Sequence, residues 1–397
     1  MSAASAPRRQ WAAIAAATAI NLPLGSLYAF SVFLHPLEVL LGVGRADLAL
    51  VFGLAAVGFS AGMNLAPALY GLAPSPALLA ACAAVSAAGI ALAASAGGLV
   101  QLAIGYAVLF GVGGGAGYLL AQQTVNLAVT SRHGLVNGYL VSLLPAGAMI
   151  AAPAFGWGIR AAGVRAALAG LAAALALTGV AGVWLIARSG VTLEAASGAR
   201  APVAAERRRA AFWRLWLIFF LAASAGLMVL SQAAGIIAAY GGALWLAVYG
   251  TTFITGSIAA ARLLGGWMVD GLPIPAVAAG AHAVALGGNA ALALWPGPWM
   301  AVIALALVGV GYGLISGVTA ASVAVYWSRA LYGRVASRLY LAWCAAAVVL
   351  PVVAGRLFDL THGYETAVRI AAGANVLGVL IALGLPRQER RRESGGP

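Results

Sequence analysis

The chain has 397 residues, of which 63% are hydrophobic and 8% are charged, and its mean hydropathy is +0.99. Because soluble globular domains carry about 25% charged residues, this composition excludes a soluble domain and predicts an all-α membrane protein that crosses the bilayer many times. The net charge of +13 comes from arginines that cluster between apolar runs, a pattern that favours contact with lipid over binding to nucleic acid.

A window of about 19 residues finds twelve apolar spans, and we expect each to form a transmembrane helix. They lie at about 10–34, 46–70, 76–96, 98–128, 135–159, 164–188, 212–238, 243–268, 274–295, 298–327, 332–355 and 364–386. One long polar segment separates six spans from six. The predicted organisation is an N-terminal half at 1–188, a cytoplasmic linker at 189–211, a C-terminal half at 212–386 and a cytoplasmic tail at 387–397.

The distribution of arginine predicts how the chain sits in the membrane. All 22 basic residues are arginine, and with Arg262 set aside, sixteen fall on the side of the termini and five on the opposite side. Cytoplasmic loops carry the excess of basic residues, so both termini should be cytoplasmic. The lack of lysine in a chain rich in alanine and glycine is typical of a GC-rich bacterial genome, so we expect a bacterial inner (plasma) membrane protein.

Short glycine and proline motifs of the first half recur about 200 residues later. The pairs are GVGGG at Gly111 with GVGYG at Gly309, GLAPSPA at Gly71 with GLPIPA at Gly271, and the set Gly134, Pro153, Gly156 with Gly333, Pro351, Gly355. Repeats of this kind predict two pseudo-symmetric halves of six helices, with a substrate site near the midplane between them. Twelve helices in two such halves resemble the major facilitator superfamily, whose halves rock about a central cavity.

Two segments resemble one branch of that superfamily, the oxalate/formate antiporters and monocarboxylate transporters. In the first span, the run carrying the resemblance is Gly25, Tyr28, Phe30, Ser31, Val32, Phe33, Pro36 and Leu37. In the eighth span it is ARLLGGWMVD, from Ala261 to Asp270. The resemblance implies that Arg262 binds a substrate carboxylate and that Gly265, Gly266 and Asp270 form a cytoplasmic gate. It also implies an aromatic cavity wall, for which Tyr118 and Tyr340 are the candidates.

Arg262 also stands out on physical grounds, because it is a permanent cation inside a long apolar run. A charge at membrane depth is costly and by default marks a functional site. The guanidinium presents a planar fork that holds a carboxylate through two hydrogen bonds. The alternative is structural, since Asp270 lies about 12 Å further along a helix and the side chain could bend toward the cytoplasm and pair with it.

Polar residues on facing helices are further candidates for substrate binding. Tyr118, Gln122 and Asn126 share one face of the fourth span at i, i+4 and i+8, and a polar stripe in lipid must face protein or water. The alternative is that the Gln and Asn side chains join neighbouring helices by hydrogen bonds. Tyr28 and Ser31 of the first span and Asn64 of the second complete the candidate set.

Departures from the resembled branch narrow the substrate. Monocarboxylate transporters of mammals carry an Asp one turn before the arginine, where this chain has Ile258, and a lysine in the first helix, where it has none. One buried charge suits a substrate of one charge, so we expect a secondary transporter that moves lactate, pyruvate or a similar monocarboxylate by alternating access. Both proton symport and exchange of one anion for another remain open. We expect a monomer in the lipid bilayer with no cofactor and no metal.

A second class of function rests on the pattern G-x-S-x-G at Gly58, Ser60 and Gly62. This pattern marks the nucleophile of many serine hydrolases, and His282 is the one plausible buried base. The motif needs a turn between a strand and a helix, whereas Ser60 lies inside a predicted helix. We therefore keep an intramembrane hydrolase only as an alternative.

Overall fold

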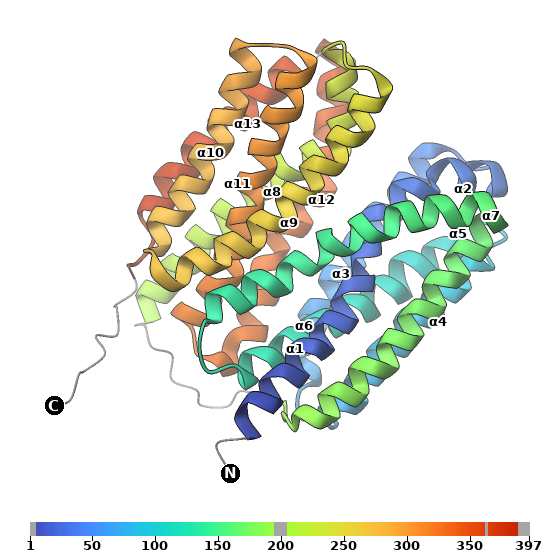
Figure 1. Ribbon diagram of the computed structural model, residues 1–397, viewed down its shortest axis with the longest axis vertical. Helices are drawn as coiled ribbons and strands as arrows, with labels where there is room; N and C mark the ends of the chain where they lie inside the picture. The colour runs from blue at the N-terminus through green and yellow to red at the C-terminus, as the bar shows by residue number, and fades with distance from the viewer. Residues whose placement is uncertain (1–4, 194–204, 362–363, 388–397) are drawn as a thin grey trace.

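The computed structural model describes residues 5–193, 205–361 and 364–387, and these residues form a bundle of helices (Figure 1). Within these ranges, backbone pairing of the β type is limited to an isolated bridge between Tyr70 and Ala73. The all-helical architecture predicted from the composition is therefore confirmed. Most of the predicted linker, at 194–204, and the predicted tail from residue 388 lie outside the described residues.

The N-terminal half follows the predicted spans, with local changes of helix type. Its elements are α1 (Ser5–Leu24), η1 (Gly25–Phe33), α2 (Leu34–Leu41), α3 (Arg45–Leu69), α4 (Ser75–Ala94), α5 (Leu99–Leu102), η2 (Ala103–Phe110), α6 (Gly111–Ala128) and α7 (His133–Ser189). The 3-10 helix η1 interrupts the first predicted span, and the π-helix η2 interrupts the fourth.

A single residue turns α7 back on itself, where the sequence predicted two spans. Gly163 has a φ of 86° and a ψ of 170°, a conformation that only glycine adopts readily. The two arms on either side of Gly163 are the fifth and sixth predicted spans, joined without a loop (Figure 1).

The C-terminal half repeats this arrangement. Its elements are α8 (Ala205–Ala239), α9 (Leu244–Gly271), α10 (Ile274–Leu294), α11 (Pro298–Tyr326), η3 (Arg329–Leu331), α12 (Tyr332–Thr361) and α13 (Glu365–Leu383). α8 begins inside the stretch predicted as linker. The repeated motifs occupy matching places, because Gly111 and Gly309 lie in α6 and α11, while Gly134 and Gly333 lie at the starts of α7 and α12.

Ten helices of the described part are long and apolar enough to cross a membrane. One of these is α7, which supplies two arms, and α12 is not among the ten. With both arms of α7 and with α12, the segments number twelve and fall six to each half, as predicted. The chain is therefore a multi-pass membrane protein.

Exposed tryptophans mark both ends of the bundle. α1 begins and α13 ends at the same end of the molecule (Figure 1). Near that end lie Trp11, Trp184, Trp213 and Trp267, and near the opposite end lie Trp157, Trp245, Trp295 and Trp299, each more than half exposed. Tryptophan is enriched at both interfaces of a bilayer, so the two groups fit the two membrane surfaces.

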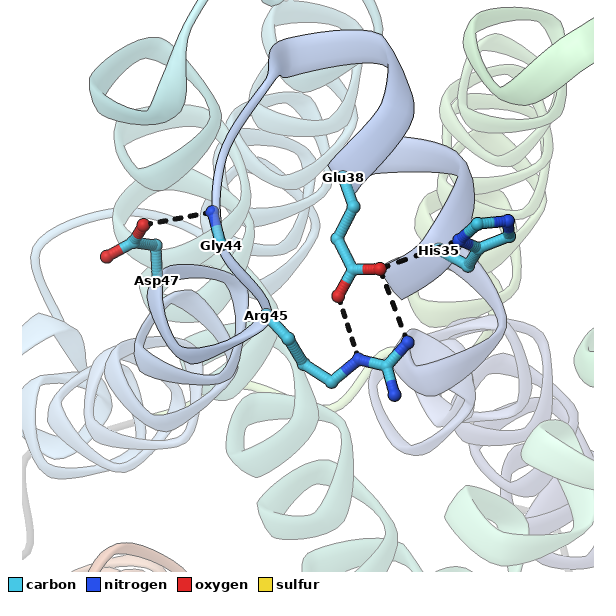
Figure 2. A network of polar contacts seen from close by, with 5 residues as sticks. All are labelled: His35, Glu38, Gly44, Arg45 and Asp47. Carbon is cyan, nitrogen blue, oxygen red and sulfur yellow. Dashed lines mark hydrogen bonds and ion pairs between the residues drawn. The ribbon is translucent and has the colours of Figure 1, made fainter.

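The end opposite the termini carries a polar network between α2 and α3 (Figure 2). Arg45 donates to both carboxylate oxygens of Glu38 at 2.8 and 3.2 Å, and His35 lies 3.5 Å from the same carboxylate. Asp47 accepts the backbone N–H of Gly44 and so caps the start of α3. The carboxylates of Glu38 and Asp47 therefore make their contacts at the membrane surface and not within the bundle.

Candidate functional site

A small cavity lies between the two halves. It is lined by Tyr28 of η1, Phe59 of α3, Tyr118 of α6, Leu144 of α7, Phe219 of α8, Arg262 of α9, Tyr312 and Ser316 of α11, and Tyr340 and Trp343 of α12. Both halves contribute, so the cavity occupies the position at which the internal repeat places a substrate site. Among these residues Arg262 carries the only formal charge.

Arg262 is fixed from both halves. Its side chain is 5% exposed, and it donates one hydrogen bond to the Val141 carbonyl of α7 and one to the Tyr312 hydroxyl, both at 2.9 Å. The guanidinium carbon also lies 5.2 Å from the centre of the Tyr312 ring. The Nε–H makes no hydrogen bond within the described part of the chain. A buried donor without a partner is costly, and this N–H of the guanidinium can still donate to a further acceptor.

The pairing of Arg262 with Asp270, considered as a structural alternative, does not occur in this conformation. Asp270 does not pair with Arg262, because its two carboxylate oxygens accept the backbone N–H groups of Gly134 and Leu135 at 2.7 and 2.8 Å. The ion pairs found among the described residues belong to Glu38 and Glu365. The positive charge of Arg262 therefore faces neutral groups.

Aromatic rings form the walls around this charge. The Tyr118 and Tyr340 hydroxyls lie 3.3 Å apart across the two halves. Tyr28 meets the edge of Trp343 with ring centres 6.1 Å apart, and Phe59 packs on Tyr118 at 5.5 Å. The cavity thus combines an apolar wall with phenol hydroxyls, which can donate to an anion.

The structure separates the predicted substrate residues into two groups. Arg262, Tyr28, Tyr118 and Tyr340 line the one cavity. The other four predicted residues do not line this cavity, and these are Gln122, Asn126, Asn64 and Ser31.

Three of the four make contacts that join helices. Asn126 exchanges a pair of 2.9 Å hydrogen bonds with Asn137 of α7. Asn64 bridges the halves by donating to the Ser337 carbonyl at 3.2 Å. Gln122 accepts the Tyr332 hydroxyl at 3.2 Å. Ser31 is exposed on η1 and does not line the cavity. The helix-joining alternative therefore describes Gln122 and Asn126 in this conformation, and Asn64 makes a contact of the same kind.

The predicted gate residues lie where α9 crosses both α7 and α11. A Cβ on Gly266 would overlap the backbone of Gly134 and Gly138, and one on Gly265 would overlap the backbone of Leu314. Glycine is therefore needed at both positions for the close crossing. Asp270 caps the N-terminus of α7 from the other half of the protein.

A second contact mirrors this one through a different residue. Gln123 of α6 accepts the backbone N–H of Gly333, at the start of α12, at 2.7 Å and donates to the Arg329 carbonyl at 3.0 Å. Tyr70, which stands 200 positions before Asp270, has its hydroxyl beside Gly333. The two halves are thus joined, near the end of the bundle where the termini lie, by one carboxylate and one neutral amide.

The sequence alone did not single out Tyr312, Ser316, Phe59, Phe219, Leu144 or Trp343 as site residues. One signal was present for Tyr312, because it replaces a glycine in the second copy of the repeated motif, GVGYG against GVGGG. A large side chain at one copy of a close-packed repeat needs a space to occupy. The cavity between the halves provides that space.

The hydrolase alternative is not supported by the geometry. Ser60 lies inside the continuous helix α3, so the required turn between strand and helix is not present there. The Nδ1 atom of His282 lies 2.9 Å from the Asn375 Oδ1 atom of α13. The side chains of Ser60 and His282 are both buried, and neither lines the cavity.

Comparison with known proteins gives the fold a name. No protein-family model matches the chain, and no curated protein sequence matches it. Among solved structures, the proton:xylose symporter XylE bound to 6-bromo-6-deoxy-D-glucose has a TM-score of 0.73 at 12% identity, over 95% of this chain and 96% of the other. FucP in the outward conformation gives 0.71 at 14% identity, over 96% and 98%.

A variant (N162A) of the fucose:proton symporter FucP of E. coli gives a TM-score of 0.68 at 16% identity, over 96% of this chain and 98% of that one. Identities this low establish the fold and not the substrate. With twelve membrane-crossing segments in two repeated halves around a central cavity, the chain has the fold of the major facilitator superfamily.

Proposed function

We propose that this protein is a secondary transporter that moves a small monocarboxylate, such as lactate or pyruvate, across the membrane by alternating access. The observation that carries the proposal is Arg262, a buried guanidinium at the centre of the two halves whose partners in the described structure are neutral. The similar structures are sugar symporters, but a neutral sugar would leave this charge uncompensated. A carboxylate would neutralise it and form two charge-assisted hydrogen bonds.

The number of charges in the cavity favours one carboxylate over two. Arg262 is the single cation among the lining residues, and the rest of the lining is aromatic, aliphatic or hydroxylic. A dianion would bring a second negative charge into an apolar site without a partner, which is costly. The resemblance to the oxalate/formate and monocarboxylate branch supports the same role for Arg262.

Transport can be coupled in two ways, by proton symport or by exchange of anions. The described carboxylates Glu38, Asp47, Asp270 and Glu365 lie at or near helix ends, and none lines the cavity. In proton symport the substrate or the network around Arg262 carries the proton, and in exchange a second anion returns through the same site. Lactate uptake that an inward acid gradient accelerates without internal anion identifies symport, whereas uptake that requires internal anion and ignores pH identifies exchange.

Purified protein in proteoliposomes tests the proposal through Arg262. Arg262→Gln should abolish uptake of labelled lactate and pyruvate, and Arg262→Lys should retain a small fraction because it keeps the charge but loses the fork. The control is Arg338→Gln, since Arg338 is also an arginine of a spanning helix but is exposed on α12. Uptake by Arg262→Gln at the wild-type rate would overturn the proposal.

A structural role for Arg262 gives a different result. In that case Arg262→Gln would lower the unfolding temperature in detergent, and lactate would not stabilise the wild-type protein. A thermal-shift screen of carboxylates against the wild-type protein therefore belongs beside the transport assay. Stabilisation by monocarboxylates, and weaker stabilisation by dicarboxylates and sugars, is the expected pattern.

A further inference from the structure

Unpartnered polar groups lie in the core on the cytoplasmic side of the cavity. Asn21, Gln122 and Thr319, which we call the inner polar layer, are each no more than 1% exposed. Both amide atoms of Asn21, the Nε2 of Gln122 and the hydroxyl of Thr319 make no hydrogen bond within the described part of the chain. Leaving such groups buried without partners is costly, so their presence needs a cause.

Helix spacing places these groups below the cavity. Gln122 lies one turn of α6 beyond Tyr118, about 6 Å closer to the cytoplasmic end. Thr319 lies two turns of α11 beyond Tyr312, about 10 Å in the same direction, and at i+7 it shares the face of Tyr312. Asn21 lies in α1, which begins at the cytoplasmic end, seven residues before Tyr28 of η1. The layer therefore lies on the cytoplasmic side of the cavity, and Gln122 and Thr319 continue the faces of α6 and α11 that line it.

Gln122 connects the layer to the other half of the protein. Its Oε1 accepts the hydroxyl of Tyr332, and Gln122 lies one turn of α6 from Tyr118, which lines the cavity. The oxygen of this amide is thus used in holding the two halves together, while its N–H₂ group has no partner. A free amide donor next to the cavity is a group that a carboxylate can use.

Within a membrane, polar groups persist where they face other polar groups or a water-filled path. The inner polar layer lacks protein partners in this conformation, in which contacts between the halves close its cytoplasmic side. Opening these contacts would admit water and substrate to the same groups. The polar groups that are costly to bury in the closed state then have a function in the open state.

We propose that Asn21, Gln122 and Thr319 form a second, weaker binding position for the transported carboxylate, on the cytoplasmic side of Arg262. The inference rests on the proposed function and adds a stage to it. The amide N–H₂ groups and the hydroxyl donate to a carboxylate that leaves the guanidinium, so that the anion does not cross an apolar layer. Because these donors are neutral, the anion binds them less tightly than Arg262 and is released.

Two near-isosteric variants test this position in proteoliposomes. Asn21→Leu and Thr319→Val each remove polar groups without opening a cavity of any size. Each should slow uptake of labelled lactate by about five-fold, because one net hydrogen bond is lost in the rate-limiting passage. The double variant should slow uptake by about 25-fold if the two sites are independent. Stabilisation of the purified variants by lactate should match the wild type, because Arg262 is intact.

The matched control is Asn289→Leu. Asn289 is 4% exposed with an unpartnered Nδ2, but it lies on α10, which does not line the cavity. All three single variants should keep or raise the unfolding temperature, and the control should transport at the wild-type rate. Wild-type transport by Asn21→Leu and Thr319→Val, or a lower unfolding temperature in both, would overturn the inference while leaving the proposed function standing. Failure of lactate to bind or cross in the wild-type protein would overturn both.

Discussion

Tyr312 determines how the guanidinium of Arg262 is presented. Its hydroxyl accepts one N–H of the fork, which leaves the hydroxyl proton free to be donated toward the cavity. The ring lies against Gly226 of α8, where a Cβ would overlap it, so the close approach of α8 fixes its position. Tyr312 is thus a positioning residue for the Arg262 guanidinium.

Replacing Tyr312 by Phe should weaken lactate binding more than it slows transport at saturation. Losing a hydrogen bond to a charged group should raise KM about ten-fold, while kcat changes little. The control is Tyr106→Phe, since the Tyr106 hydroxyl is buried without a partner and away from the cavity. Initial rates of uptake over a range of lactate concentrations measure both constants, and an unchanged KM for Tyr312→Phe would contradict the role.

Residues differ in how far the sequence predicts them. Arg262 could be found from the sequence because a charge in an apolar run is conspicuous, and Tyr118 because it begins a polar stripe. Trp343 and Phe219 could not, since aromatic residues in an apolar chain look the same whether they face lipid, core or cavity. Gln122 and Asn126 share a face of α6, yet only the structure shows that one joins the halves and the other pairs with Asn137.

At the scale of elements, the crossing of α9 between α7 and α11 depends on small residues. A side chain at Gly266 would meet the backbone of α7, which cannot move aside as a flexible side chain can. Overpacking of this kind typically costs about 1–3 kcal/mol. The crossing places both Arg262 and Asp270, because both lie on α9.

Gly266→Ala should therefore lower the unfolding temperature and reduce lactate uptake together. The control is Gly287→Ala in α10, where a Cβ would meet nothing within 4 Å. That variant should be neutral or slightly stabilising, because alanine favours a helix by about 1 kcal/mol over glycine. A Gly266→Ala protein with wild-type stability and transport would show that the crossing tolerates a wider separation.

The sequence predicted where the spans lie much better than it predicted how they are built. Apolar length alone places a membrane helix, so all twelve segments could be located from composition. The 3-10 segment η1 and the π-helix η2 could not, because such changes of hydrogen-bond register depend on how neighbouring helices pack. The turn at Gly163 likewise needs a single residue, where the sequence predicted a short loop.

At the scale of the whole molecule, the hydrogen bonds described between the halves lie at the depth of the cavity or between the cavity and the end of the bundle where the termini lie. Arg262 with Val141 and Tyr118 with Tyr340 meet at the cavity. Asp270 and Gln123 each accept backbone N–H groups at a helix start nearer the termini. The conformation is therefore one in which polar contacts close the side of the termini, and one of these contacts is charged while the other is neutral.

This asymmetry predicts which contact controls opening. A carboxylate at a helix N-terminus is favoured by the partial positive charge there, an effect of about 1 kcal/mol that a neutral amide lacks. Asp270→Asn should thus shift the population by about five-fold toward the state in which this side is open.

Spin labels on the exposed positions Ser131 and Gly271, which flank this contact on the two halves, report the separation in a background without the native Cys82 and Cys344. Asp270→Asn should enlarge the long-distance fraction. A distance distribution that Asp270→Asn leaves unchanged would mean that the apolar packing of α9 on α7, and not the charged contact, holds this side closed.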